Sequence, residues 1–229
     1  MARLSRLGNT MAKTIYVVGG TNGVGKSTIR EELLDSSIPY INADFIAKEM
    51  KGGQTSLMLA ELAREYGSGQ MKKFIAAGES FAFENNLHEA KTFQWLQQMQ
   101  QEGGYRIEIF YIGLSNLKVT TRRIRERVER GEHYIPPEEV LLRYESGIKL
   151  LGHYFFMPEK LVLIDNAVAP LITLQAEKGV IDYRKLAPFK WVLQILRPVL
   201  EGVKPSVSPQ SLTSIEEVRQ LYNSQIKKN

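Results

Sequence analysis

The sequence predicts an α/β protein with a doubly wound, mostly parallel sheet flanked by helices. Apolar, β-branched runs alternate with helix-like segments along the chain, which is typical of parallel sheets. A glycine-rich loop joins the first apolar run to the first helix-like segment. Polar residues close several of the runs, at the sheet edge where ligands bind in such folds.

The length of 229 residues allows one such domain with its own core, which we predict at residues 13–202. Residues 1–12 are expected to be a disordered extension, because a second methionine, Met11, stands just before the first strand. Residues 203–229 are expected to form a linker and a C-terminal helix, because a Pro- and Ser-rich stretch precedes a helix-like segment at 214–226.

The first half of the chain contains three predicted strands, which are short apolar runs bounded by turn residues: Thr14–Val18, Pro39–Asn42 and Ser80–Phe83. Helix-like segments lie between and after them, at Ser27–Leu34, Phe45–Met50, Leu57–Tyr66, Met71–Ala77 and Leu87–Gln101. Gly67-Ser68-Gly69 is expected to end the third helix before the fourth begins.

The second half continues the alternation with a central strand at Arg106–Ile112 and a last strand at Leu161–Ile164. Ser115 is a predicted N-cap for a helix that runs to Arg130. A turn-rich break at residues 131–137 leads into further predicted helices, at Glu138–Leu151 and Pro188–Leu200.

The glycine-rich loop fits the pattern G-x-x-x-x-G-K-[ST] of a Walker A motif, and it has the strand before it and the helix after it that this motif requires. Its backbone N–H groups and the N-terminus of the next helix favour phosphate. Lys26 is predicted to bind the outer phosphates of a nucleoside triphosphate, and Ser27 to ligate Mg²⁺. The predicted nucleotide-binding residues are Gly20, Thr21, Asn22, Gly23, Val24, Gly25, Lys26, Ser27 and Thr28.

Carboxylates stand at the ends of two predicted strands. Asp44 follows Ile41-Asn42-Ala43, where it would accept the proton of an attacking hydroxyl; the alternative is that it caps the next helix. Glu84 and Asn85 close the third strand, where they would bind acceptor hydroxyls or a metal-bound water; the alternative is that Glu84 is solvated at the sheet edge.

Arginines gather in the helix before the turn-rich break, and Arg143 lies on the helix after it. Guanidinium groups suit phosphate oxygens, so we predict a helical lid in which Arg127, Arg130 and Arg143 take part in catalysis and Arg123 contacts the nucleotide. The alternative is a solvated helix face paired with glutamates. After the last strand, Asn166 would contact the adenine base or cap a following helix.

The amino-acid composition limits the kinds of site and partner that the chain can have. The chain lacks cysteine, which excludes disulfides, cysteine–zinc sites and thiol nucleophiles, and it contains no apolar run of the ~20 residues that a membrane span needs. The net charge of +5 favours anionic ligands. Because the basic residues gather in one helix rather than alternating with aromatics, we expect no nucleic-acid partner. The absence of cysteine is compatible with the cytoplasm, where we expect this protein.

Several of these segments together resemble the zeta-toxin family of P-loop small-molecule kinases. The resemblance covers roughly residues 14–170, in the family's order. The matching pieces are Asn22-Gly23-Val24-Gly25-Lys26-Ser27-Thr28, Ile41-Asn42-Ala43-Asp44, Ser80-Phe81-Ala82-Phe83-Glu84, Arg127-Val128 through Gly131-Glu132-His133-Tyr134-Ile135-Pro136, Arg143-Tyr144-Glu145-Ser146-Gly147 and Asp165-Asn166.

The resemblance implies a P-loop kinase fold and an ATP- and Mg²⁺-dependent kinase that phosphorylates a hydroxyl of a small metabolite, in the family a UDP-sugar such as UDP-N-acetylglucosamine. It implies that Asp44 is the catalytic base, Lys26 the phosphate-binding lysine and Glu84 a substrate-binding carboxylate. It also implies lid arginines at Arg143 and at Arg127 or Arg130, and an antitoxin protein as a partner.

Two alternatives remain open at this point. One is a non-toxic metabolic small-molecule kinase. The other is a P-loop nucleotide-binding switch or ATPase, which usually carries an acid after a central strand to hold Mg²⁺. The strand Arg106–Ile112 is followed by Gly113-Leu114, which offers no acid and favours a transferase.

Overall fold

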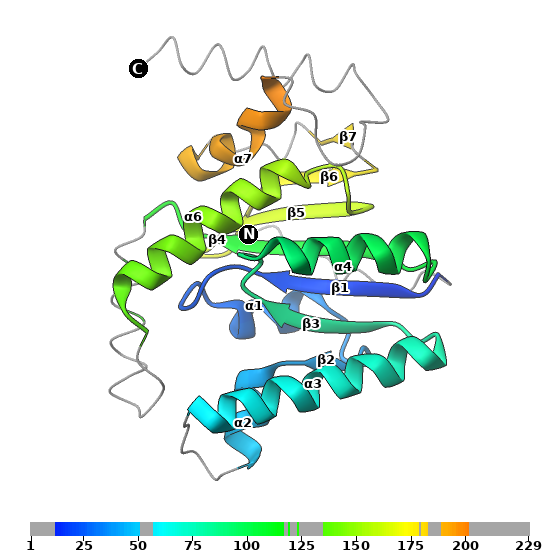
Figure 1. Ribbon diagram of the computed structural model, residues 1–229. Coiled ribbons are helices and arrows are strands. Elements are labelled where there is room, and N and C mark those ends of the chain that lie inside the picture. Colours follow the sequence, from blue (N-terminus) through cyan, green and yellow to red (C-terminus); the bar gives the residue numbers. More distant parts are fainter. Residues whose placement is uncertain are drawn as a thin grey trace.

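The computed structural model describes residues 12–50, 57–116, 119, 123, 135–178, 180–182 and 189–201. Within these ranges the chain forms a seven-stranded sheet in the order β2-β3-β1-β4-β5-β6-β7 (Figure 1). The strands are β1 (Thr14–Gly19), β2 (Tyr40–Ile41), β3 (Phe81–Asn85), β4 (Arg106–Gly113), β5 (Lys160–Asp165), β6 (Leu171–Glu177) and β7 (Val180–Ile181). β1 to β5 are parallel to one another, so the predicted doubly wound, mostly parallel sheet is confirmed.

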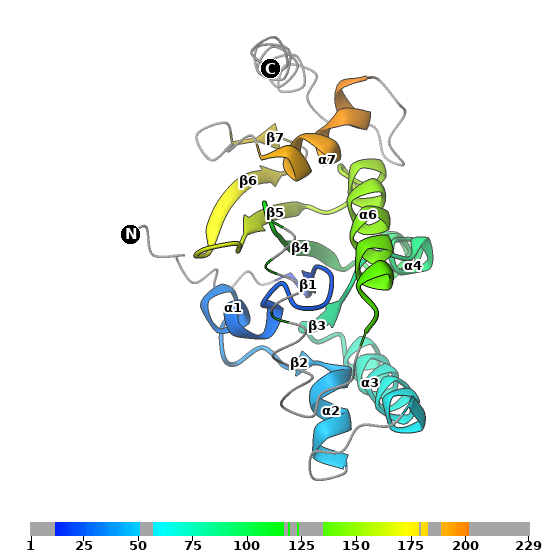
Figure 2. The same ribbon diagram turned by 90° about the vertical axis from the view of Figure 1, so that its left-hand side faces the viewer.

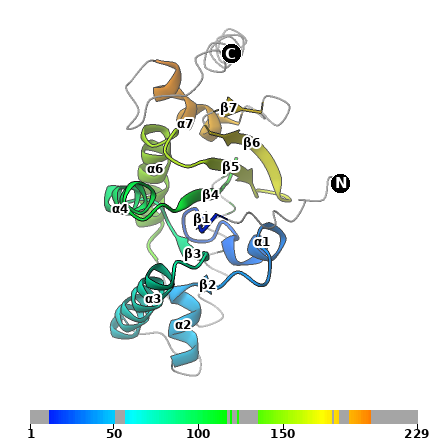
Figure 3. The same ribbon diagram turned by 90° about the vertical axis from the view of Figure 1, so that its right-hand side faces the viewer.

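Helices cover both faces of this sheet, as Figures 2 and 3 show: α1 lies on one face, and α3, α4 and α6 lie on the other. The described helices are α1 (Lys26–Leu33), α2 (Ala43–Met50), α3 (Leu57–Ala77), α4 (Ala90–Gln101), α6 (Pro137–His153) and α7 (Lys190–Leu200). None of them is both long enough and apolar enough to span a bilayer.

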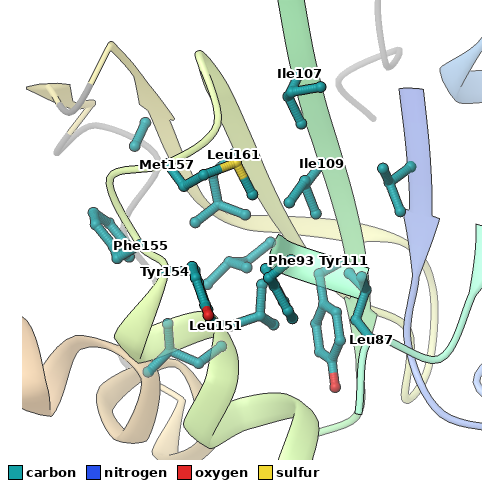
Figure 4. Packing of buried hydrophobic residues seen from close by; sticks show 14 of the residues in the cluster. Leu87, Phe93, Ile107, Ile109, Tyr111, Leu151, Tyr154, Phe155, Met157 and Leu161 are labelled. Atoms are coloured by element: carbon teal, nitrogen blue, oxygen red, sulfur yellow. The ribbon is translucent and has the colours of Figure 1, made fainter. Parts of the chain in front are cut away.

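The period-two alternation of β1 explains the two layers. Ile15 and Val17 belong to the large core under α4, α6 and α7, whereas Tyr16 and Val18 belong to the smaller core under α1. Figure 4 shows the large core, in which Phe93 of α4 packs with side chains of β4 and β5. This two-sided burial fixes the register of β1 and therefore the place of the loop that follows it.

Two helix boundaries differ from the sequence expectation. The helices expected at 57–66 and 71–77 form one continuous helix, α3. Gly67 does not break it, because a helix tolerates an isolated glycine at a cost of ~1 kcal/mol and here the missing side chain lets α3 approach Ile41 of β2 closely. The helix expected from Leu87 begins only at Ala90, since Leu87 has a left-handed backbone with φ 55°.

The antiparallel strands β6 and β7 were not expected from the sequence. They continue the sheet beyond β5 and follow it in the chain without a helix between. Of the helix expected from Ser115 to Arg130, the structure describes Ser115 and Asn116, which are not helical, and Val119 and Arg123, which are. The extension expected at 1–12 lies outside the described residues except for Ala12, and the segment 203–229 lies wholly outside them.

Candidate functional site

The glycine-rich loop connects β1 to α1 at the carboxyl edge of the sheet. Gly20, Gly23 and Gly25 have φ values of 132°, 79° and 95°, a region that other residues adopt only with strain. A Cβ at Gly20 would lie 2.3 Å from the carbonyl oxygen of Ile112, so the loop runs directly against β4. Gly25 precedes the first residue of α1, Lys26, which places the helix N-terminus at the loop.

Lys26 is buried at the centre of the loop, with 6% of its side chain exposed. Its Nζ donates hydrogen bonds to the carbonyl oxygens of Gly20 (2.7 Å) and Thr21 (3.1 Å) and to Oδ1 of Asn86 (3.2 Å). The same Nζ lies 3.4 Å from Oε1 of Glu84. A buried ammonium needs such partners, and all of them converge on the place where the motif binds phosphate.

Glu84 lies beside the loop rather than at a solvated sheet edge. Its Oε2 accepts hydrogen bonds from the Tyr40 hydroxyl (2.8 Å), the Asn42 side-chain amide (2.8 Å) and the Ser27 hydroxyl (3.3 Å). Burial, reinforced by the negative charge of Glu84, raises the pKa of Tyr40 far above its ordinary range, so this hydroxyl stays a neutral donor. The carboxylate is therefore held between β2, β3 and the start of α1.

Asp44 lies in the first turn of α2, just after β2, and is exposed. It is not the cap of this helix: Oδ1 of Asn42 accepts the N–H groups of Asp44 (2.8 Å) and Phe45 (3.3 Å), so Asn42 is the N-cap. The same Asn42 donates to Glu84. Asn42 thus links the helix that carries Asp44 to the carboxylate beside Lys26.

The two asparagines after Glu84 differ in their contacts. Oδ1 of Asn85 accepts the N–H of Leu87 (2.7 Å) and so stabilises the turn, which leaves its side-chain N–H groups for the acceptor hydroxyls that the sequence predicted it to bind. Asn86, which the sequence did not single out, contacts Lys26 and donates from Nδ2 to Oδ1 of Asn22 (3.1 Å). Neither spacing nor composition distinguishes Asn86 from Asn85 in the sequence, because the geometry of the turn decides which of the two amides faces the loop.

Arg143 of α6 reaches the loop as well. Its guanidinium donates to Oδ1 of Asn22 (2.9 Å) and pairs with Glu139 one turn before it. The neighbouring α6 residue Val140 accepts a hydrogen bond from the Thr21 hydroxyl (3.3 Å). Of the expected lid arginines, Arg143 therefore contacts the loop, while Arg127 and Arg130 lie outside the described residues.

Arg123 and Asn166 meet on the other side of the loop. The Asn166 amide donates to the carbonyl oxygen of Val24 (2.8 Å), and Arg123 donates to the same oxygen (3.3 Å) and to the Asn166 carbonyl (3.1 Å). The alternative that Asn166 caps a helix is wrong, because the next described element is β6. Thr28 is exposed in the first turn of α1, beside Ser27.

Asp165, which the sequence indicated only through the family resemblance, connects the ends of several elements at this edge of the sheet. It is 4% exposed and accepts hydrogen bonds from the backbone N–H and hydroxyl of Ser115, the N–H of Ala167 and the indole of Trp191 (3.1 Å). One carboxylate therefore joins the ends of β4 and β5 to α7. Its neighbour Asn166 is thereby held against the loop.

The arrangement as a whole combines an anion-binding loop with oxygen ligands suited to a small cation. Among the residues described, no group of three or more histidines, aspartates and glutamates is placed to hold a metal ion by itself. No acid follows β4, but β3, the other neighbour of β1, carries Glu84 to within 3.3 Å of the Ser27 hydroxyl. The missing acid after β4 therefore does not distinguish a transferase from a switch.

Comparison with known proteins identifies the domain type. A family model of an AAA domain, AAA_33, matches residues 15–151, more than half of the chain. A protein of Haemophilus influenzae, described as uncharacterized, is 30% identical over 125 residues, which cover 55% of this chain and 88% of that protein.

Two solved structures share the fold. One comes from the PezAT chromosomal toxin–antitoxin system of Streptococcus pneumoniae, with a TM-score of 0.55, 13% identity and coverage of 99% of this chain and 92% of that chain. The other is AvrRxo1-ORF1:-ORF2 with ATP, with a TM-score of 0.51, 13% identity and coverage of 87% and 66%. These likenesses confirm the expected fold, a mostly parallel sheet flanked by helices of the P-loop kinase type.

Proposed function

The chain belongs to the AAA-domain family whose model it matches, and we propose that it is an ATP-dependent kinase that transfers the γ-phosphate to a hydroxyl of a small metabolite. The observation that carries this proposal is the convergence on Lys26. The Glu84 carboxylate of β3 lies 3.4 Å from Lys26 of the phosphate loop, and Arg143 of α6 donates a hydrogen bond to Asn22 of the same loop. Phosphoryl transfer relies on this kind of positioning and charge stabilisation.

ATP would bind with its outer phosphates in the loop. The Lys26 amine donates to two loop carbonyls, and phosphate oxygens would replace these acceptors. Arg143 donates a hydrogen bond to Asn22 of the loop, and its guanidinium would reorient from Asn22 to contact the transferred phosphate. A solved neighbour with the same fold contains ATP, which supports this nucleotide.

The residues present also fit Mg²⁺, which prefers oxygen ligands and keeps several waters when it binds nucleotide phosphates. The Ser27 hydroxyl would be a direct ligand, and Glu84, 3.3 Å from that hydroxyl, would accept a hydrogen bond from a metal-bound water. When bound, the ion neutralises charge that develops on the phosphates. Tyr40 and Asn42 would hold the Glu84 carboxylate in place.

Asp44 would be the base. Its carboxylate would take the proton from the acceptor hydroxyl while that oxygen bonds to the γ-phosphorus and the bond to the β–γ bridging oxygen breaks, which yields ADP and a phosphorylated acceptor. The exposure of Asp44 at the start of α2 leaves it accessible to an acceptor. UDP-N-acetylglucosamine is the first acceptor to test, since the zeta-toxin resemblance implies it, and an antitoxin partner follows from the same resemblance.

The test is to incubate the purified chain with γ-labelled ATP and Mg²⁺, in the presence of either a metabolite extract or UDP-N-acetylglucosamine, and to identify the labelled product. Asp44→Asn should retain ATP binding and lose transfer by about 10²- to 10⁴-fold. Glu49→Gln, an exposed carboxylate on the same helix, is the matched control and should behave as the unmodified chain. Full transfer by Asp44→Asn would remove the assignment of the base.

The same preparation separates the remaining alternatives. ATP turnover that no acceptor stimulates, across a metabolite panel, would favour a nucleotide-dependent switch. Growth arrest on expression, abolished by Asp44→Ala, would indicate a toxic kinase, and transfer without growth arrest would indicate a metabolic one.

A further inference from the structure

The turn after β3 is built to aim one side chain at the phosphate loop. Leu87 is fully buried, and its left-handed backbone (φ 55°) is a conformation that a leucine rarely adopts. The side-chain oxygen of Asn85 closes this turn through the Leu87 N–H. A Cβ on Gly19 would lie 2.4 Å from Leu87, so this side chain is packed directly on β1. Strain maintained by such packing is found where a fold positions a functional group.

The positioned group is Asn86. Its Oδ1 accepts a hydrogen bond from Lys26 (3.2 Å), and its Nδ2 donates to Oδ1 of Asn22 (3.1 Å). An ammonium can only donate, so the contact with Lys26 fixes which end of the amide faces which partner. Asn86 therefore connects the phosphate-binding lysine to the opposite side of the loop.

The connection continues to the lid. The same Oδ1 of Asn22 accepts a hydrogen bond from Arg143 (2.9 Å). One turn further along α6, a Cβ at Gly147 would lie 3.4 Å from the Leu87 carbonyl oxygen and 3.6 Å from that of Asn86. The lid helix thus packs on the backbone of the turn that carries Asn86.

We infer that Asn86 is a positioning residue that couples Lys26 to Arg143 through Asn22, so that the lysine and the lid arginine are oriented together for phosphate. This inference rests on the proposed function, because it assigns to both cations a nucleotide phosphate. Lys26 has three N–H donors; phosphate would replace the loop carbonyls, while Asn86 keeps its place and sets the direction of the amine. Asn86 itself touches no reacting atom.

The test is a double-mutant cycle on ATP affinity, measured by calorimetry with Mg-ATP. Asn86→Ala and Arg143→Ala are each expected to weaken binding by about tenfold, since each removes a hydrogen bond made by a charged group. Independent effects would multiply to about 100-fold. Coupling through Asn22 should hold the double variant to about 10- to 30-fold. The control cycle pairs Asn86→Ala with Arg197→Ala on α7, where the effects should multiply.

Asn86→Asp distinguishes positioning from simple packing. It is nearly isosteric and keeps an acceptor for Lys26, but it cannot donate to Asn22. Combined with Arg143→Ala, it should therefore fall short of multiplication by as much as Asn86→Ala does. A merely structural Asn86 predicts instead that the effects of Asn86→Asp and Arg143→Ala multiply.

The two proposals fail in different ways. If the unmodified chain does not bind Mg-ATP, the proposed function is wrong. If it binds Mg-ATP and the Asn86–Arg143 cycle is multiplicative, the proposed function stands and the role of Asn86 is overturned. A cycle that is non-multiplicative for Arg143 and multiplicative for Arg197 supports it.

Discussion

Gly25 provides the sharpest test of how the loop is built, because two separable costs meet at this residue. Its φ of 95° is unfavourable for any side chain, at about 1–3 kcal/mol. A Cβ would also lie 2.5 Å from Nδ2 of Asn166 and would displace the amide from the Val24 carbonyl. Losing that hydrogen bond costs about 1 kcal/mol, since Arg123 still donates to the same oxygen.

Gly25→Ala should therefore lower the free energy of unfolding by about 2–4 kcal/mol. Two other glycines separate the contributions. Gly78 has a φ of 69°, and a Cβ added there would meet no atom within 4 Å, so Gly78→Ala carries only the backbone cost, about 1–2 kcal/mol. Gly69 lies inside α3, where a Cβ would meet no atom within 4 Å and the backbone is not left-handed, so neither the backbone cost nor the steric cost applies. Gly69→Ala should therefore stabilise the chain by up to about 1 kcal/mol.

The assay is urea unfolding followed by tryptophan fluorescence, with linear extrapolation to water. The expected order of stability is Gly69→Ala above the unmodified chain, then Gly78→Ala, then Gly25→Ala. A Gly25→Ala chain as stable as Gly78→Ala would show that the Asn166 contact does not constrain the loop. Mg-ATP binding should weaken in Gly25→Ala and remain unchanged in Gly78→Ala.

Three further predictions concern single side chains. Lys26→Met should weaken ATP binding by at least about tenfold in calorimetry, because it removes a charged donor from the phosphates; unchanged affinity would contradict the phosphate-loop assignment. Asp165→Asn should lower the free energy of unfolding by about 2–3 kcal/mol, because a buried carboxylate loses its charge among four donors, whereas Ser115→Ala should cost about 1 kcal/mol; equal losses in urea unfolding would refute the bridging role. Burial raises the pKa of Glu108 despite its cationic neighbours Lys160 and Arg106, so the folded chain holds this proton to higher pH than the unfolded chain does. The stability that this proton contributes is present below the ordinary glutamate pKa and is lost as pH rises through the raised pKa of the folded chain. Glu108→Gln should therefore gain stability relative to the unmodified chain as pH rises above the ordinary glutamate pKa, and a pH-independent difference would contradict this sign.

The parallel part of the fold could be predicted because its signals are local. The motif from Gly20 to Ser27 fixes a strand, a loop and a helix together, and buried strands such as β4 and β5 are continuous apolar runs. β6 was missed because its pattern, with Leu171 exposed and Leu174 buried, needs β5 beside it to be recognised as a strand. The break expected at Gly67 failed because tertiary contact with β2 outweighs a glycine's weak helix propensity.

The site could be predicted only in part, for a related reason. Strand ends identified Glu84, which does lie beside Lys26. Which of Asn85 and Asn86 faces the loop depends on the left-handed backbone of Leu87, and no pattern in the sequence indicates that conformation. The bridging role of Asp165 depends on Trp191, which approaches it only because α7 packs at the end of the sheet.

The strand order has a consequence for the time at which the protein acquires its phosphate loop during synthesis. β1 is made first but pairs with β3 and β4, which the ribosome delivers much later, and Gly20 packs against Ile112 near the end of β4. A nascent chain that ends before β4 therefore lacks the wall on which the loop rests. The phosphate loop, which lies near the beginning of the sequence, therefore gains its full packing only after about half of the chain has been translated.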